Sequence, residues 1–103
     1  MNVRKLVDYG TMYRELVAIL ARNLPQMDEI YAIGKVISQR PEKGAAVAAA
    51  EFLQANFPDR TGFSPRNVRR MRVFCKTYEN DQTLLRLAMK IGWTLNVVIM
   101  EAE

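Results

Sequence analysis

The chain has 103 residues, half of them hydrophobic, which fits one globular domain spanning 1–103 and excludes a disordered or low-complexity chain. A single cysteine and the absence of histidine exclude an intramolecular disulfide and remove the commonest metal ligand and general base. With a net charge of +4 and no catalytic or metal-binding motif, we expect a non-enzymatic protein without cofactor or metal.

The first two dozen residues carry apolar side chains every three or four positions, the period of one helical face. They predict a helix that starts at Val3 or at Met12 and ends at Asn23. If Gly10 splits this stretch, residues 1–11 form an N-terminal arm. Charged residues interrupt the apolar run, so it is neither a signal peptide nor a membrane span. We therefore expect a cytoplasmic protein without a membrane partner.

A second helix is predicted from Pro25 onward, with its buried stripe at Ile30, Ile33, Gly34 and Ile37. Gly34 either lets another helix approach closely or is a weak point that costs about 1 kcal/mol.

A third, alanine-rich helix is predicted from Glu42 to Asn56, since Pro41 disfavours helix at the residue before it. The fourth has a strong start signal: Ser64 is a good N-cap and Pro65 suits the first helical position. This helix covers residues 65–78, and Phe63 can pack on Val68 across its first turn.

A fifth helix carries Leu84, Leu87 and Ile91 and stops at Gly92. The tail that follows fits either a strand or a final helix, and we favour a helix capped by Thr94 with its apolar residues inward. The expected fold class is therefore all-α, a five- to six-helix domain with a helix-turn-helix-like core.

Six of the fifteen bases and none of the acids lie between positions 60 and 76. On a helical wheel of residues 65–78, most of the apolar residues fall on one arc and most of the basic residues on the opposite one, with Val73 in the middle of the basic arc. Arginines three or four positions apart repel each other by a few tenths of a kcal/mol per pair, and no acid precedes Glu79 on this helix to offset them. Such a conflict with local stability is typical of a functional surface.

We interpret this helix as the recognition helix of a helix-turn-helix pair that binds DNA, with the alanine-rich helix lying across the backbone. Arg66, Asn67 and Arg70 would reach the edges of the DNA bases, and the other basic side chains of this region would contact phosphates. The candidate nucleic-acid contacts are Arg60, Ser64, Arg66, Asn67, Arg69, Arg70, Arg72 and Lys76.

The competing interpretation is a basic face that is solvated, or paired with acids of another helix or of a partner protein. Cys75 falls in the apolar arc, so we expect a buried hydrophobic residue and not a nucleophile. The carboxylates of Asp28, Glu29, Glu101 and Glu103 are expected at solvated helix ends. For a homodimer, the candidate interface is the tail, through Trp93, Leu95, Val98 and Ile99, although core packing suits Trp93 better.

Three segments, "YAIGKVISQRPEKG", "GFSPRNVRRMRVFCKTY" and "IGWTLNVVIMEAE", resemble in order the N-terminal domain of the YhcG-like nuclease family. The central block is the most specific, because Gly62, Phe63, Ser64, Asn67, Met71, Arg72 and Phe74 all match its pattern.

The resemblance implies a helical, DNA-binding domain that normally precedes a restriction-endonuclease-like domain. An alternative to independent DNA binding is therefore a fragment, or a stand-alone relative whose nuclease domain is supplied by a separate nuclease partner. The resemblance also implies that Arg72 is structural. The segment between Gly44 and Phe63 is shorter than in the family, and Leu95 stands where the family often has histidine.

Overall fold

The computed structural model describes residues 8–102, and within them the chain forms six α-helices and no strand. The fold class predicted from the sequence is therefore confirmed as all-α. The helices are α1 (Gly10–Ala21), α2 (Gln26–Ser38), α3 (Lys43–Asn56), α4 (Pro65–Tyr78), α5 (Gln82–Ile91) and α6 (Trp93–Met100).

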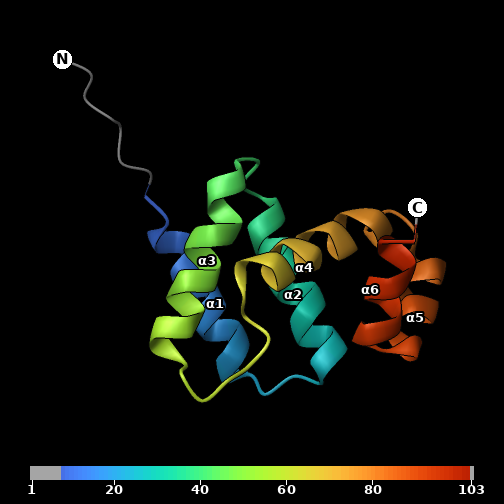
Figure 1. Cartoon of the computed structure of the whole chain (residues 1–103), viewed down its shortest axis with the longest axis horizontal. Coiled ribbons are helices and arrows are strands. Elements are labelled where there is room, and N and C mark those ends of the chain that lie inside the picture. Colours follow the sequence, from blue (N-terminus) through green and yellow to red (C-terminus); the bar gives the residue numbers. More distant parts are fainter. Residues whose placement is uncertain (1–7, 103) are drawn as a thin grey trace.

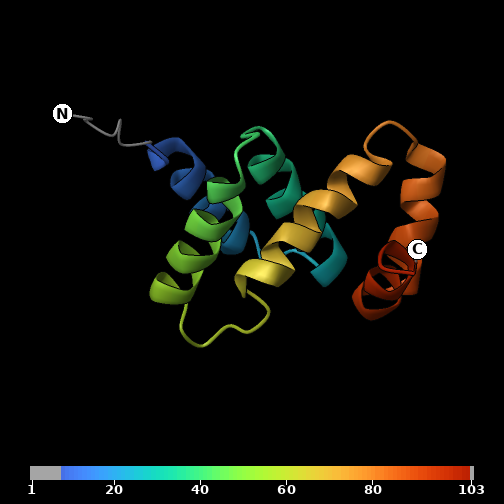
Figure 2. The ribbon, with the colours of Figure 1, turned by 45° about the horizontal axis from the view of Figure 1, so that its top comes forward.

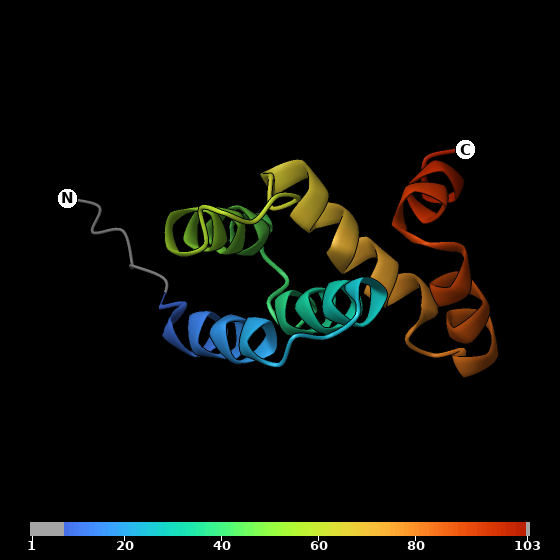
Figure 3. The same ribbon diagram turned by 90° about the horizontal axis from the view of Figure 1, so that it is seen from below.

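The helices form two groups (Figure 1). Helices α1–α4 form a body, and α5 and α6 form a hairpin that follows the C-terminal end of α4. In the body, α1 and α2 lie in one layer and α3 and α4 in another (Figure 3). The most extensive packing between helices is that of α4 on α2, followed by α4 on α3. The basic helix is thus held on two sides by the body.

Gly34 lies where α2 crosses α4. A Cβ atom at this position would lie 2.2 Å from the carbonyl oxygen of Met71 and 3.1 Å from the Cβ of Cys75. The missing side chain therefore permits the close approach of the two helices, which decides between the two interpretations of this glycine. The stripe around it, formed by Ile30, Ile33 and Ile37, is buried as predicted.

The first helix begins at Gly10, two residues before the later of the two predicted starts, and ends at Ala21. The Oδ1 of Asp8 accepts the Gly10 backbone N–H at 2.8 Å, which satisfies one of the free amides of the first turn. Residues 1–7 of the predicted N-terminal arm lie outside the described residues.

The fifth helix is capped by Asp81, whose carboxylate accepts the backbone N–H of Leu84 at 3.0 Å. It stops at Gly92 as predicted, because the φ of +85° there favours glycine and turns the chain into α6. The tail is a helix, not a strand, and Gly92 rather than Thr94 is its N-cap.

The α5–α6 hairpin stands at one end of the molecule, which extends 50 × 30 × 21 Å with the hairpin included (Figure 2). The prediction that the tail turns its apolar residues inward is wrong, since Leu95, Val98 and Ile99 are exposed. The buried position of α6 is Asn96, whose amide donates to the carbonyls of Ala88 and Gly92, both at 2.7 Å. The hairpin is therefore closed by a polar side chain and leaves its aliphatic residues outside.

Within residues 8–102, no single helix has both the length and the apolarity needed to cross a membrane. Only α5 and α6 taken together pass that test by length and composition, and they are bent by 118° relative to each other.

Candidate nucleic-acid interface

The basic helix α4 starts at the predicted residue with the predicted cap. The Ser64 hydroxyl accepts the Asn67 backbone N–H at 3.1 Å, and Pro65 occupies the first turn. The loop before it needs a φ of +88° at Gly62, and Phe63 is buried. These contacts fix the direction in which α4 leaves the loop, and with it the direction of the arginines.

Asn67 has its side-chain amide engaged inside the protein. The amide donates to the carbonyl of Gly62 at 2.7 Å, while its oxygen accepts the indole N–H of Trp93 at 3.0 Å. Asn67 therefore ties the loop and α6 to α4. A contact of this side chain with adenine would require both bonds to open.

Arg60 is bound to the body by an ion pair with Glu29, a mostly buried carboxylate of α2. Its guanidinium also lies over the ring of Phe63, 5.4 Å from the centroid. These contacts attach the loop of residues 57–64 to α2. Glu29 is thus an internal partner and not the solvated helix end that the sequence predicts.

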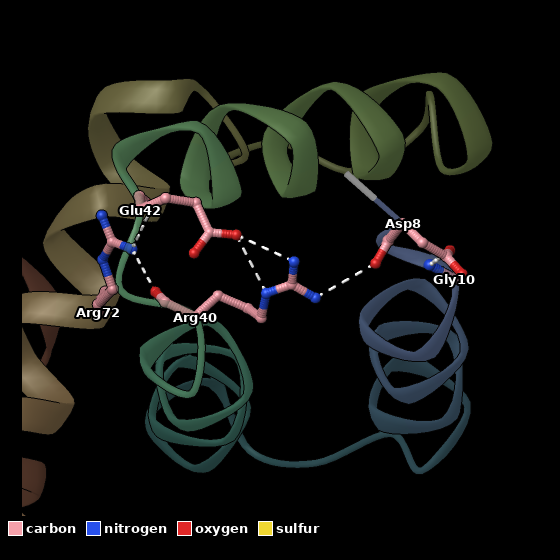
Figure 4. A network of polar contacts seen from close by, with 5 residues as sticks. All are labelled: Asp8, Gly10, Arg40, Glu42 and Arg72. Atoms are coloured by element: carbon pink, nitrogen blue, oxygen red, sulfur yellow. Dashed lines mark hydrogen bonds and ion pairs between the residues drawn. The ribbon is translucent and has the colours of Figure 1, made fainter. Parts of the chain in front are cut away.

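Arg72 holds the connection between α2 and α3 (Figure 4). Its guanidinium donates to the backbone carbonyls of Arg40 and Glu42, each at 3.1 Å. The Arg40 side chain in turn pairs with the Glu42 carboxylate at 3.0 Å and donates to the carbonyl of Asp8. A backbone hydrogen bond to the Glu42 carboxylate within the same residue is the largest effect that lowers the pKa of Glu42, and Arg40 lowers this pKa further. Arg72 is therefore an internal hydrogen-bond donor, as the resemblance implied.

Arg70 forms a two-pronged ion pair with Glu101, just beyond the C-terminal end of α6. Its Nε and one of its terminal nitrogens lie 2.9–3.1 Å from the two carboxylate oxygens. The Arg70 side chain is 23 % exposed, and that of Glu101 is 47 % exposed. The second acid that the sequence treats as a solvated helix end thus also binds an arginine. Glu103 lies outside the described residues.

Arg66, Arg69 and Lys76 are exposed on the outer face of α4. Arg69 reaches only the carbonyl of Pro65 on its own helix, at 3.4 Å. Val73, in the middle of this face, is half exposed as the wheel predicts. A groove of about 300 Å³ lies between α4 and α6. It is lined by Arg66, Arg69, Val73, Met100 and the Arg70–Glu101 pair.

Cys75 is fully buried on the opposite face of α4, which confirms the prediction of its place. Burial raises the pKa of its thiol, and Glu79 raises it further. Among the described residues, no three His, Cys, Asp or Glu side chains are grouped as metal ligands.

Three contacts that position the site were not predicted from the sequence: Glu29 with Arg60, Glu101 with Arg70, and the indole N–H of Trp93 with Asn67. Carboxylates were expected in water, because a sequence does not show which arginine a distant acid will meet. Trp93 packs edge-on against Phe74, 5.7 Å between centroids, so it belongs mainly to the core. The tail residues Leu95, Val98 and Ile99 are instead open at the surface.

The motif "GFS…N…M-R…F" has an internal explanation for every position. Gly62 turns the loop, Ser64 caps α4, and Asn67 and Arg72 bond to neighbouring segments. The apolar members Phe63, Met71 and Phe74 are buried. The motif therefore builds the position of α4, while the exposed arginines stand outside it.

A family model described as the DUF1016 N-terminal domain matches residues 12–103, almost the whole chain. No curated protein and no solved structure shows significant similarity to the sequence.

Proposed function

The chain belongs to the family of DUF1016 N-terminal domains, the YhcG-like family, and from that premise we propose that it is a non-enzymatic module that binds duplex DNA through α4. The observation that carries the proposal is the outer face of α4. Arg66, Arg69 and Lys76 are exposed there, and α4 itself contains no acid to neutralise them. Exposed arginines on one face of a well-anchored helix are suited to phosphate oxygens.

The contacts inside the protein define which arginines are available. Arg60 and Arg72 are engaged with Glu29 and with backbone carbonyls, so their contribution to DNA binding is to position the loop and the helix. Asn67 is bonded on both sides of its amide, which leaves Arg66 as the base-reading candidate in the first turn. We therefore propose affinity that comes mainly from phosphates, with weak sequence preference.

The pose follows the helix-turn-helix arrangement, with α4 in the major groove and α3 across the backbone. The connection of residues 57–64 is longer than the usual turn of that motif. Its ion pair between Arg60 and Glu29 fixes the longer connection against α2.

The test is a titration of fluorescently labelled duplex DNA over a series of salt concentrations. Replacing Arg69 and Lys76 by glutamine should reduce the magnitude of the slope of log affinity against log salt by about 1.8, because each is proposed to contact a phosphate and about 0.9 counterions are released per phosphate contact. The matched control is Arg86→Gln with Lys90→Gln, which removes the same charge from exposed positions of α5. We expect the control to retain nearly the full slope.

Two results would contradict the proposal: no binding of duplex at about 50 mM salt, or an equal loss in both double variants. The alternative function is a protein-interaction module, in which the same face meets an acidic protein, including a separately encoded nuclease. The Arg70–Glu101 pair favours this alternative, since it is an example of a carboxylate bound at the face. A nuclease gene beside this one, together with absent DNA binding, would support it.

A further inference from the structure

The α5–α6 hairpin exposes two apolar stripes, one on each helix. The residues lie at spacings of three and four, so each set occupies one side of its helix. All six side chains are between 41 % and 58 % exposed. We call them the hairpin stripes: Leu84, Leu87 and Ile91 on α5, and Leu95, Val98 and Ile99 on α6.

Each stripe borders the face that already packs inward. On α5 the buried residues are Leu85 and Ala88, and on α6 the buried residue is Asn96. The apolar arc of α5 is thus wider than the part that the body covers. A helix in water is normally apolar only over the face it buries, so the uncovered part indicates a second packing partner.

The charges in and around the hairpin restrict the nature of that partner. Residues 82–100 contain Arg86 and Lys90 and no acid, and on the α5 wheel both bases lie outside the stripe. The carboxylates directly before and directly after these residues are engaged within the chain, because Asp81 caps α5 and Glu101 is paired with Arg70. A charged partner would find no complementary group between the stripe residues, whereas an uncharged apolar helical face would fit. The hairpin of another copy is such a face.

We propose that a second copy of this chain covers the hairpin stripes, pairing α5–α6 with α5–α6 about a two-fold axis. Six half-exposed aliphatic residues offer on the order of 500 Å² per copy, so a pair buries about 1,000 Å². This area is at the lower limit of specific interfaces and corresponds to a reversible dimer. Trp93 lies outside the interface, because its indole is bonded to Asn67 within the chain.

The proposed dimer is independent of the proposed DNA binding. Its test measures only the mass of the protein in solution, without DNA. Sedimentation velocity of the full chain is measured from about 1 to 300 μM, the range in which an interface of this size dissociates. Leu87→Glu on α5 and Val98→Glu on α6 should each raise the dissociation constant at least about tenfold, since each places a charge inside an apolar interface. The matched control is Val47→Glu, on an exposed position of α3, which should leave the dimer unchanged.

The three variants replace exposed residues, so far-ultraviolet circular dichroism should show the helical content of the parent chain in each. A parent chain that stays monomeric over the whole range overturns the proposal, including a monomer that instead binds lipid vesicles. An equal effect of Val47→Glu overturns it as well. A dimer weakened by only one of the two hairpin substitutions would overturn the joint interface.

Discussion

At the scale of single residues, arginines that are neighbours in the sequence have different roles. Arg72 donates to two backbone carbonyls of the α2–α3 connection, and Arg70 binds the carboxylate of Glu101. Arg66 and Arg69 face outward. The difference arises because positions along a helix advance by about 100°, so each side chain meets a different segment or only water. The arginine cluster thus contains one structural residue, Arg72, and one residue paired with an acid, Arg70. The remaining two, Arg66 and Arg69, are exposed.

Arg72→Ala should destabilise the fold by about 2 kcal/mol, because it leaves two partly buried carbonyls without their charged donor. Urea denaturation followed by circular dichroism measures the loss. The control is Arg69→Ala on the exposed face, which we expect to change the free energy of unfolding by less than about 0.5 kcal/mol. Equal effects of the two substitutions would show that the carbonyl contacts of Arg72 contribute nothing.

At the scale of helices, α4 is organised by its contact with α2. Val68, Met71, Phe74 and Cys75 are buried, as the wheel of residues 65–78 predicts. The helices can approach this closely only because Gly34 has no side chain at the crossing. The outer face of α4 is consequently held in a fixed direction, since the inner face is buried and crosses α2 closely at Gly34.

Gly34→Ala should destabilise the protein by about 3 kcal/mol, although alanine is the better helix former by about 1 kcal/mol. The added Cβ would lie 2.2 Å from the carbonyl oxygen of Met71, which is backbone and can move only with α4. Gly44→Ala on α3 is the control, since its Cβ meets only the Tyr9 hydroxyl at an ordinary 3.5 Å. Thermal unfolding should show a lower melting temperature for Gly34→Ala and an unchanged or slightly higher one for Gly44→Ala. A neutral Gly34→Ala would contradict the close crossing.

At the scale of the whole molecule, α4 connects a body that holds it and a hairpin that closes over part of its outer face. The ion pair of Arg70 with Glu101 and the bond of Asn67 with Trp93 both run between α4 and the α6 region. Glu101 lines the same groove as Arg66 and Arg69, and its carboxylate binds the guanidinium of Arg70 there. On the proposed function, this carboxylate competes with phosphate for Arg70.

Glu101→Gln should therefore strengthen binding of duplex DNA and steepen its salt dependence by about 0.9, because it frees one arginine for a phosphate contact. The salt titration described above provides the measurement. Glu51→Gln, an exposed acid of α3, is the control for the change in net charge. If both substitutions strengthen binding equally, the gain is due to net charge and not to release of Arg70. Adding Arg70→Gln to the Glu101 variant should cancel the specific gain.

The all-helical fold and most of the buried residues of α1–α4 could be predicted from local patterns in the chain. Ser64 with Pro65, Gly92 and the apolar stripe of residues 65–78 act through local geometry, so their signals can be read from the chain alone. The family was also recognisable, because the residues of its motif set the turn, cap and packing of one helix.

The pairing of charges and the covering of apolar residues in α6 could not be predicted, because they depend on contacts between distant segments. Arg70 pairs with Glu101, which lies 31 positions away in the sequence, and Arg60 pairs with Glu29, which is also 31 positions away. The inward face of α6 belongs to Asn96, whose amide donates to the carbonyls of Ala88 and Gly92, while Leu95, Val98 and Ile99 are exposed. Such outcomes depend on how helices are placed relative to one another, which the period of a single helix does not contain.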